Sequence, residues 1–239
     1  NGHYLFSDST IYALALQGDG KILVGGPFYG GIARLNPDGS EDESFDPGAG
    51  VGKDGLGADV RAIALQDDGK ILIGGNFATF DGAEALRIAR LNADGSRDTG
   101  FDVGVDGDYN DDYRPEMSGG RFREVKSILA LADNSIIVSG WDSDIIYDGR
   151  PLYHDGGVVK RDSTGVEIDS FFFAGKSDVN ALAQRPDGAV VAGGAFRRSK
   201  YSVPHLGELQ IPYRHSLAFF SADLELAFDL DAPVTSAGE

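Results

Sequence analysis

The sequence predicts an all-β fold, and three observations support that prediction. A sixteen-residue pattern occurs four times, in copies that begin at Ile11, Val60, Val125 and Val179. Each copy holds two apolar stretches separated by Asp-Gly or, in the third copy, by Asp-Asn. The second stretch ends in Gly-Gly or Ser-Gly, and the chain contains 34 glycines in 239 residues. Glycine supplies the positive φ that tight hairpin turns need, so this pattern favours β-hairpins.

The two apolar stretches of each copy are predicted to be paired strands. In the second copy they are residues 60–66 and 70–73, joined by a turn at Asp68-Gly69. The second stretch has no polar alternation, which is typical of a strand that is covered on both faces. The Gly-Gly pair that closes it indicates a close approach of backbone, as where the units of a repeat converge.

A second pair of strands is predicted further along each copy. In the first copy the third strand is 32–35, a turn follows at 36–39, and the copy ends on Phe45. We interpret this closing aromatic residue as a wedge between neighbouring units. Units of four strands and roughly 50 to 65 residues are typical of β-propeller blades. The third strands of the later copies are expected at 88–91, 158–161 and 217–220.

We therefore expect a single β-propeller domain over residues 1–239, with four four-stranded blades or as an arc of a larger propeller. A chain of this length can bury one sizeable core. Residues 4–6 could add an outer strand to the last blade and close the ring, and an open arc is the alternative. Because the first residue is Asn1 and not Met, we expect a processed chain or part of a longer one. The repeat units are expected at 11–59, 60–124, 125–178 and 179–230.

These motifs resemble the delta-60 repeat, a bacterial β-propeller repeat of unassigned function. The likeness is strongest in the first two copies, where Ile-Ala-Arg-Leu-Asn and Phe-Asp follow the Gly-Gly pair. The third copy departs from the pattern at Asn134-Ser135 and Ser139, and the fourth lacks the Lys after Asp-Gly. A more distant likeness is to kelch repeats, whose usual closing Trp is missing here. The resemblance implies an extracellular or cell-surface location on a bacterium or a phage-related surface.

Composition removes several classes of function. The net charge is −17, which disfavours nucleic acid as a partner because nucleic-acid binding needs Lys and Arg to neutralise phosphates. This charge is compatible with calcium, with cationic partners, or with solubility alone. The absence of Cys excludes disulfides, thiolate metal sites and a Cys nucleophile. No apolar run approaches the length of about 18 residues that a membrane span needs, so we expect no membrane insertion.

Long insertions interrupt the repeat after the second strands and between copies. Strands alternate direction within a blade, so both kinds of insertion are expected on one face of the disc, which is often the binding face of a repeat protein. Exposed aromatic residues there would anchor a protein or glycan partner, and the alternative is that they form a small core of the loops themselves. The candidate ligand-binding residues are Trp141, Tyr147, Tyr153, His154, Tyr201, His205 and Tyr213.

One insertion carries acidic residues at alternating positions. Calcium takes six to eight oxygen ligands, many of them carboxylates, so this stretch is a candidate calcium site. It is not an EF-hand, because Asp111 stands where Gly is required and Met117 where the bidentate Glu belongs. A solvated acidic loop is the alternative. The candidate ligands are Asp106, Asp108, Asn110 and Asp112.

The sequence contains no Gly-x-Ser-x-Gly elbow, no phosphate-binding loop and no His-Glu-x-x-His motif. We therefore predict a non-enzymatic binding or recognition module for a protein or glycan, without catalytic residues and with calcium as the candidate cofactor. A purely structural repeat domain of a larger secreted or filament protein is the first alternative. A carboxylate-dependent hydrolase is the second, because paired carboxylates can cleave glycosidic bonds.

Overall fold

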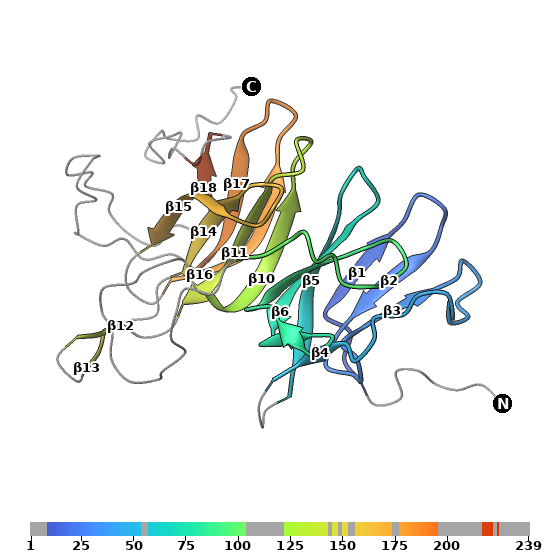
Figure 1. Ribbon diagram of the computed structural model, residues 1–239. Helices are drawn as coiled ribbons and strands as arrows, with labels where there is room; N and C mark the ends of the chain where they lie inside the picture. Colours follow the sequence, from blue (N-terminus) through green and yellow to red (C-terminus); the bar gives the residue numbers. More distant parts are fainter. Residues whose placement is uncertain are drawn as a thin grey trace, which may run out of the picture.

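The computed structural model describes residues 9–53, 57–103, 122–142, 145–147, 150–152, 156–173, 177–195, 217–221 and 224. Every regular element in those residues is a strand, and none is a helix, as the repeat pattern predicted. Figure 1 shows the strands as a row of small sheets. The strands are β1 (Ala13–Leu16), β2 (Ile22–Gly25), β3 (Ile32–Leu35), β4 (Val51–Gly52), β5 (Asp59–Leu65), β6 (Ile71–Asn76), β7 (Thr79–Phe80), β8 (Ala83–Glu84), β9 (Ile88–Leu91), β10 (Phe122–Ala130), β11 (Ile136–Asp142), β12 (Ile145–Tyr147), β13 (Arg150–Leu152), β14 (Gly156–Arg161), β15 (Glu167–Phe173), β16 (Asp178–Gln184), β17 (Val190–Ala195) and β18 (Leu217–Phe220).

Four of the sheets correspond to the four copies of the repeat, and we call them the first to fourth repeat sheets. Their strand orders are β1-β2-β3, β5-β6-β9, β10-β11-β14-β15 and β16-β17-β18, and every pairing is antiparallel. Each repeat sheet is therefore a meander of hairpins, in the order in which its strands follow along the chain.

Among the described residues, the predicted fourth strand is complete in the third repeat sheet, where it is β15, and in the last copy residues 225–230 lie outside the described residues. In the first and second copies it is reduced to single bridges, Leu35 to Glu41 and Leu91 to Arg97. Directly after each bridge the chain leaves the sheet. In the first copy the Asp42 carboxylate accepts the backbone N–H of Ser44, and the Asp42 carbonyl accepts that of Phe45. This tight turn takes the backbone out of the ladder.

The hairpin turns agree with the sequence pattern. Gly20, Gly69 and Gly188 have φ values of 86°, 84° and 86°, so the Asp-Gly turns need the left-handed conformation that glycine adopts readily. In the third copy Asn134 occupies the same place with a φ of 62°. Asparagine is one of the few other residues that tolerate this conformation, which explains why the third copy still forms its hairpin without the glycine.

The repeat sheets pack face to face in chain order, and the first strand of each later sheet lies on the two first strands of the sheet before it. Three clusters of buried apolar side chains fill the joints between consecutive sheets. The predicted wedges Phe45 and Phe101 are buried in the first two clusters, whereas Phe228 lies outside the described residues. Pairs that face each other across the three joints are Leu23 and Val60, Leu72 and Val125, and Ile137 and Val179.

Each glycine of the Gly-Gly pair lacks room for a side chain, and the neighbouring atoms that exclude one differ between the two positions. A Cβ on Gly25 would lie 2.8 Å from Cγ1 of Val60, and one on Gly74 would lie 2.5 Å from Cγ1 of Val125. The first glycine thus makes room for an aliphatic side chain of the next sheet. A Cβ on the second glycine, Gly75, would collide with the carbonyl oxygen of Asp59, at the start of the first strand of the same sheet. This is the close backbone approach that the sequence predicted.

The two ends of the stack differ. In Figure 1 the hairpin tips of β1-β2, β5-β6, β10-β11 and β16-β17 lie at one end, and β4 and β12-β13 lie at the other. We call these the turn end and the insertion end. The insertion of the second copy forms the hairpin β7-β8, which pairs with β4 from the segment between copies. Its Phe77 and Phe80 are fully buried, so in this copy the aromatic residues of the insertion form core.

At the turn end, a buried arginine ties each of the first two repeat sheets to the next. Arg34 donates from Nε to Asp42 at 2.7 Å and from Nη1 to the carbonyl of Ala93 in the second copy. Arg90 repeats the arrangement with Asp98 at 2.6 Å and the carbonyl of Ser163 in the third copy. Each guanidinium also lies over the closing aromatic ring, at 4.7 Å for Phe45 and 4.8 Å for Phe101.

We predict that Gly74→Val destabilises the fold by about 1–3 kcal/mol, because the added side chain would overpack against Val125. Gly25→Val should behave alike. Gly193 occupies the same position in the fourth repeat sheet, on which no further repeat sheet packs among the described residues, so Gly193→Val should cost markedly less. Urea denaturation of the three variants measures their losses of folding free energy. Trp141→Ala is the control, because it changes a position at which the four copies differ. Equal losses for Gly74→Val and Gly193→Val would refute this explanation.

A second prediction concerns acid. Burial raises the pKa of Asp98, but hydrogen bonds from Lys70, the Gly100 N–H and Arg90 outweigh it, so the pKa is lowered overall. A lowered folded pKa stabilises the protein above the unfolded value of about 3.9, and this contribution is lost as the pH falls below that value. Asp98→Asn should lower the free energy of unfolding at pH 7 by about 1–3 kcal/mol and flatten its decline below about pH 4. Asp67→Asn, at an exposed position, is the control and should change neither.

Candidate functional site

The structure gives backbone positions for two of the predicted ligand-binding residues. Trp141 lies near the end of β11, where it pairs with Glu124 of β10, and Tyr147 ends β12. The other five predicted residues lie outside the described residues, as do all four candidate calcium ligands. Those nine residues are Tyr153, His154, Tyr201, His205, Tyr213, Asp106, Asp108, Asn110 and Asp112.

The strand registers define which chain segments meet at the insertion end. Phe122, at the start of β10, pairs with Asp142 at the end of β11, and Asp178 pairs with Ala195 in the same way. Asp59 and Asn76 form the equivalent pair in the second sheet. The start of each first strand therefore lies beside the end of each second strand. Segments that precede a first strand and segments that follow a second strand leave the sheets at one end.

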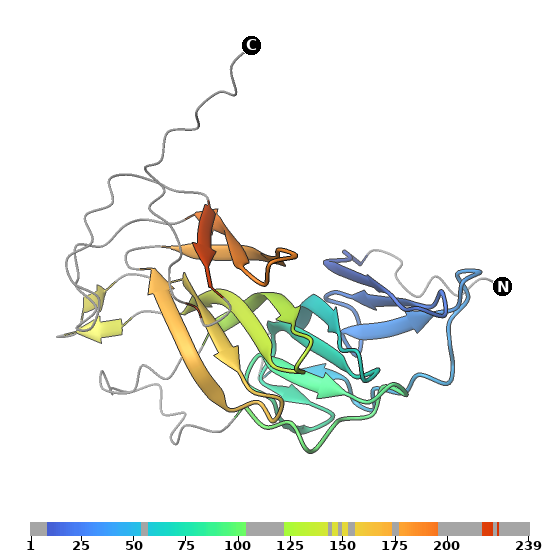
Figure 2. The ribbon, with the colours of Figure 1, turned by 90° about the horizontal axis from the view of Figure 1, so that it is seen from above.

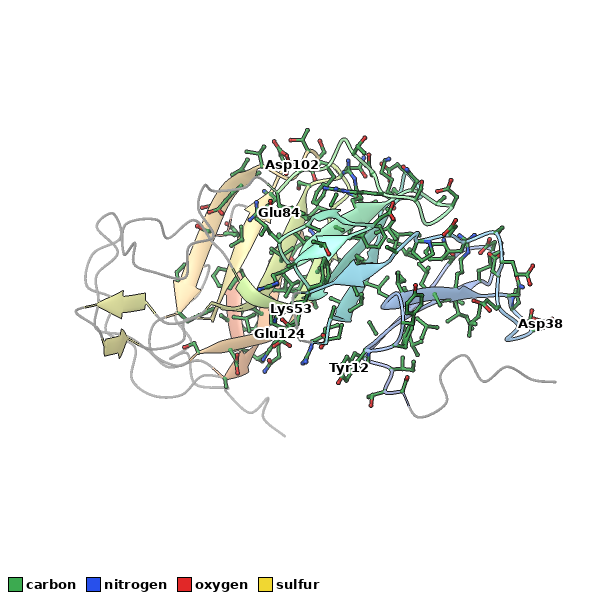
Figure 3. All side chains as sticks on the ribbon, turned by 60° about the horizontal axis from the view of Figure 1, so that its bottom comes forward. Tyr12, Asp38, Lys53, Glu84, Asp102 and Glu124 are labelled. Carbon is green, nitrogen blue, oxygen red and sulfur yellow. The ribbon has the colours of Figure 1, made fainter. Side chains whose placement is uncertain are left out.

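Polar side chains line this end at the starts of the first strands. They occupy the repeat positions directly before and directly after that of Val60, Val125 and Val179 in the first strands. We call these side chains the inner strip. In Figure 3, Tyr12, Lys53 and Glu124 lie along one side of the molecule and Asp102 along the opposite side. The residues of the inner strip are Tyr12, Asp59, Arg61, Glu124, Lys126, Asp178 and Asn180.

Arg61 is the centre of the inner strip. Its Nε donates to Oδ1 of Asp59 at 2.7 Å, and its guanidinium lies 4.9 Å from the ring centroid of Tyr12 in the first repeat sheet. Its Nη1 forms an ion pair with Oε1 of Glu124 in the third sheet, at 2.6 Å. The hydrogen bond to Asp59 and the charge of Glu124 raise the pKa of Arg61 despite its partial burial. One guanidinium thus connects three consecutive sheets.

Lys126 continues the inner strip from the third repeat sheet to the fourth. Its Nζ lies 3.2 Å from Oδ1 of Asp178 and 3.1 Å from Oδ1 of Asn180. Asp178 is 44% exposed, whereas Glu124 beside Arg61 is 12% exposed. The strip therefore changes from a partly buried ion pair at Arg61 to a solvated one at Lys126, where a carboxylate can accept hydrogen bonds from a ligand.

No group of three or more His, Cys, Asp or Glu side chains is placed to hold a metal ion in the part of the chain that the structure describes. A hollow between Glu84, Arg90, Arg97 and Asp102 encloses about 10 Å³, which is about the space of one water molecule. No described helix is long and apolar enough to cross a membrane.

Sequence reasoning missed the inner strip, although the sequence held a signal for it. The four copies align so that Tyr12, Arg61, Lys126 and Asn180 share one position within an otherwise apolar strand. A polar residue at that position, preceded two residues earlier by Asp or Glu in the last three copies, indicates side chains that converge at one end of neighbouring strands.

We predict that Arg61→Met costs about 1–2 kcal/mol of folding free energy, because Asp59 and Glu124 would lose their shared cation in a partly buried place. Lys126→Met removes a more solvated pair and should cost well under 1 kcal/mol. Urea denaturation measures both. In a double-mutant cycle with Glu124→Gln, Arg61→Met should show a positive coupling energy. Additive effects would contradict the role assigned to Arg61.

One of three comparisons with known proteins matches the repeat. The family model for a β-propeller domain of unknown function matches residues 17–45 and 66–101. Among curated proteins no relative was found. Among crystal structures, virginiamycin B lyase from Staphylococcus aureus is 12% identical over 88% of this chain and 69% of that one, with a TM-score of 0.39. A protein of unknown function from Bacteroides caccae is 12% identical over 92% and 81%, with a TM-score of 0.35.

The two structural likenesses carry no inference about activity at these identities and scores. The matched family segments begin in the first-strand turns of the first and second copies and end on Phe45 and Phe101. They therefore follow the repeat unit itself. The match supports a propeller-type repeat family for this chain.

Proposed function

We propose that this chain is a non-enzymatic recognition module that presents a protein- or glycan-binding surface at the insertion end of a β-propeller. In this proposal the four repeat sheets are blades, and the repeats are of the delta-60 type. The module is extracellular or at the cell surface, on a bacterium or a phage-related surface. Its partners are neither nucleic acid nor the interior of a membrane.

One observation carries the proposal. The registers of β10-β11 and β16-β17 bring the segments before the first strands and after the second strands to the same end of the stack. Those segments contain the only Trp and most of the Tyr and His residues of the chain. Aromatic side chains gathered on one surface anchor proteins and stack on sugar rings, and the adjacent carboxylates of the inner strip accept hydrogen bonds from hydroxyls or Arg.

The alternative of a purely structural repeat domain also has support. Arg34 and Arg90 tie each sheet to its neighbour at the turn end, and Phe77 and Phe80 use one insertion as core. In that case the remaining insertions would pack in the same manner. The two proposals differ in whether a soluble partner binds at the insertion end without the assembly of further chains.

A hydrolase has less support. Among the described carboxylates, Asp59, Glu124 and Asp178 are each paired with a cation. A pair of carboxylates for glycoside cleavage needs one group with a raised pKa, and every shifted carboxyl pKa among the described residues is lowered.

A glycan array and a pull-down from extracellular material test the recognition proposal. We expect binding that Trp141→Ala and Tyr201→Ala each weaken at least tenfold, because aromatic anchors carry much of the binding energy. The matched control is Asp67→Ala at the turn end, which should not affect binding. Parallel assays with calcium and with a chelator test the candidate site at 106–112, where Asp108→Asn should abolish any calcium dependence. Loss of binding in Asp67→Ala alone would place the partner at the turn end and contradict the proposal.

A further inference from the structure

The chain uses one kind of joint three times. In the first joint, Val60 and Ile63 of the second repeat sheet lie against Gly25 of the first. In the second joint, Val125 and Ile128 lie against Gly74 in the same way. The third joint places Val179 of the fourth sheet against Ile137 of the third, with Leu182 packed beside them. Each joint therefore brings an incoming face, from the first strand of one sheet, onto an outgoing face, from the second and third strands of the sheet before it.

The first repeat sheet has an incoming face whose apolar side chains are exposed. Leu14 and Leu16 occupy the positions of Ile63 and Leu65 in the second copy, which pack into the first joint. Leu14 is 67% exposed and Leu16 is 70% exposed, and Ile11, in the position of Val60, is also exposed. The same sequence positions that are covered elsewhere in the chain are thus open to solvent here.

The fourth repeat sheet has the complementary outgoing face, and its apolar side chains are partly exposed. Leu217 is 49% exposed, whereas Ile32, Ile88 and Val158 hold its position in the other sheets and are at most 4% exposed. Val191 is only half-buried, although Leu23, Leu72 and Ile137 at the same position are fully buried. Gly193 stands beside it in the position of Gly25 and Gly74. This sheet keeps the glycine that receives an aliphatic side chain in the first two joints.

The two open faces therefore match in chemistry and in repeat position, and they do not cover each other in this structure. Figure 2, the view from above, shows the first sheet in blue and the fourth in orange and red as the two ends of the series. Leaving both faces exposed costs free energy, since burying one Leu side chain contributes about 1.5–3 kcal/mol. The outgoing face of a second copy of the chain could cover the incoming face of the first copy.

We propose that the outgoing face of one copy docks on the incoming face of a second copy, by the same joint that the chain uses between its own sheets. The occupant is the β17-β18 face around Val191, Gly193 and Leu217. Ile11 would lie over Gly193 as Val60 lies over Gly25, and Leu14 would pack beside it as Ile63 does. The joint is head-to-tail, so it gives a closed ring of chains if the rotation closes and a filament if it does not.

Charge sets the conditions under which the joint forms. Each copy carries a net charge of −17, and two copies repel one another at low ionic strength. The joint itself is apolar, so salt screens the repulsion and leaves the attraction. We expect association to strengthen as the salt concentration rises, which is the opposite of an assembly held by ion pairs.

Light scattering and disulfide trapping test the proposal on the 239-residue chain. We expect a mass of two or more chains that increases with protein and salt concentration. Leu14→Asp should shift the equilibrium toward monomer at least tenfold without lowering the melting temperature, because Leu14 is exposed in the single chain. Val166→Asp is the matched control, since Val166 is 56% exposed in a turn outside both faces. An unchanged monomer at all concentrations would overturn the proposal.

The chain contains no Cys, so introduced cysteines report contacts without interference. Cβ atoms at positions 25 and 60 would be 3.2 Å apart, close to disulfide geometry, and the equivalent pair in the proposed joint is Gly193→Cys with Ile11→Cys. A mixture of the two single variants should form a disulfide-linked dimer of unlike chains. Tyr29→Cys, at a 94% exposed position, should not link to Gly193→Cys. If the double variant instead closes a disulfide within one monomeric chain, the faces meet intramolecularly and the proposal is wrong.

Discussion

The first two joints of the fold depend on one steric constraint, the absence of a side chain at the first glycine of the Gly-Gly pair. Because Gly25 and Gly74 have no Cβ, Val60 and Val125 can reach the backbone of the preceding sheet. Consecutive sheets then approach closely enough to bury Leu23 and Leu72 completely. Such close packing removes most of the apolar surface of these short strands from water, which is the main source of their stability. In the third joint Ser139 holds this position and is fully buried, so that joint accommodates a small side chain.

The joints are apolar in the middle, and polar contacts cross the first two at the turn end and the last two at the insertion end. At the turn end, Arg34 and Arg90 satisfy carbonyls of the next copy, and at the insertion end Arg61 and Lys126 reach carboxylates of the next sheet. Backbone carbonyls at a sheet boundary would otherwise lack partners, which is costly in a buried place. The buried arginines therefore fix the register of neighbouring sheets, while the inner strip stays partly open to solvent.

The sequence predicted the strand pairs, the hairpin turns and the close approach at Gly-Gly, because each follows from local residue chemistry that repeats in register. It overestimated the fourth strand of the first two copies, since nothing in residues 41–46 announces that the Asp42 side chain turns the backbone out of the sheet. It did not predict the inner strip, because contacts such as Arg61 to Glu124 join residues that are far apart in sequence. Such pairs depend on how sheets stack, which local patterns do not specify.

The unequal use of the two ends explains where variation is tolerated. The tight turns that carry Gly20, Gly69 and Gly188 cannot lengthen without losing the hairpin geometry, and the neighbouring arginines already bind across the joints. Segments at the insertion end meet no such constraint, so their length and composition can change without disturbing a joint. The second copy shows that such a segment can become core, through Phe77 and Phe80. Insertions of this kind can therefore change to form a binding surface, while the glycines and arginines of the joints keep the sheets in place. Because the two roles fall on different residues, a repeat scaffold can carry a recognition function.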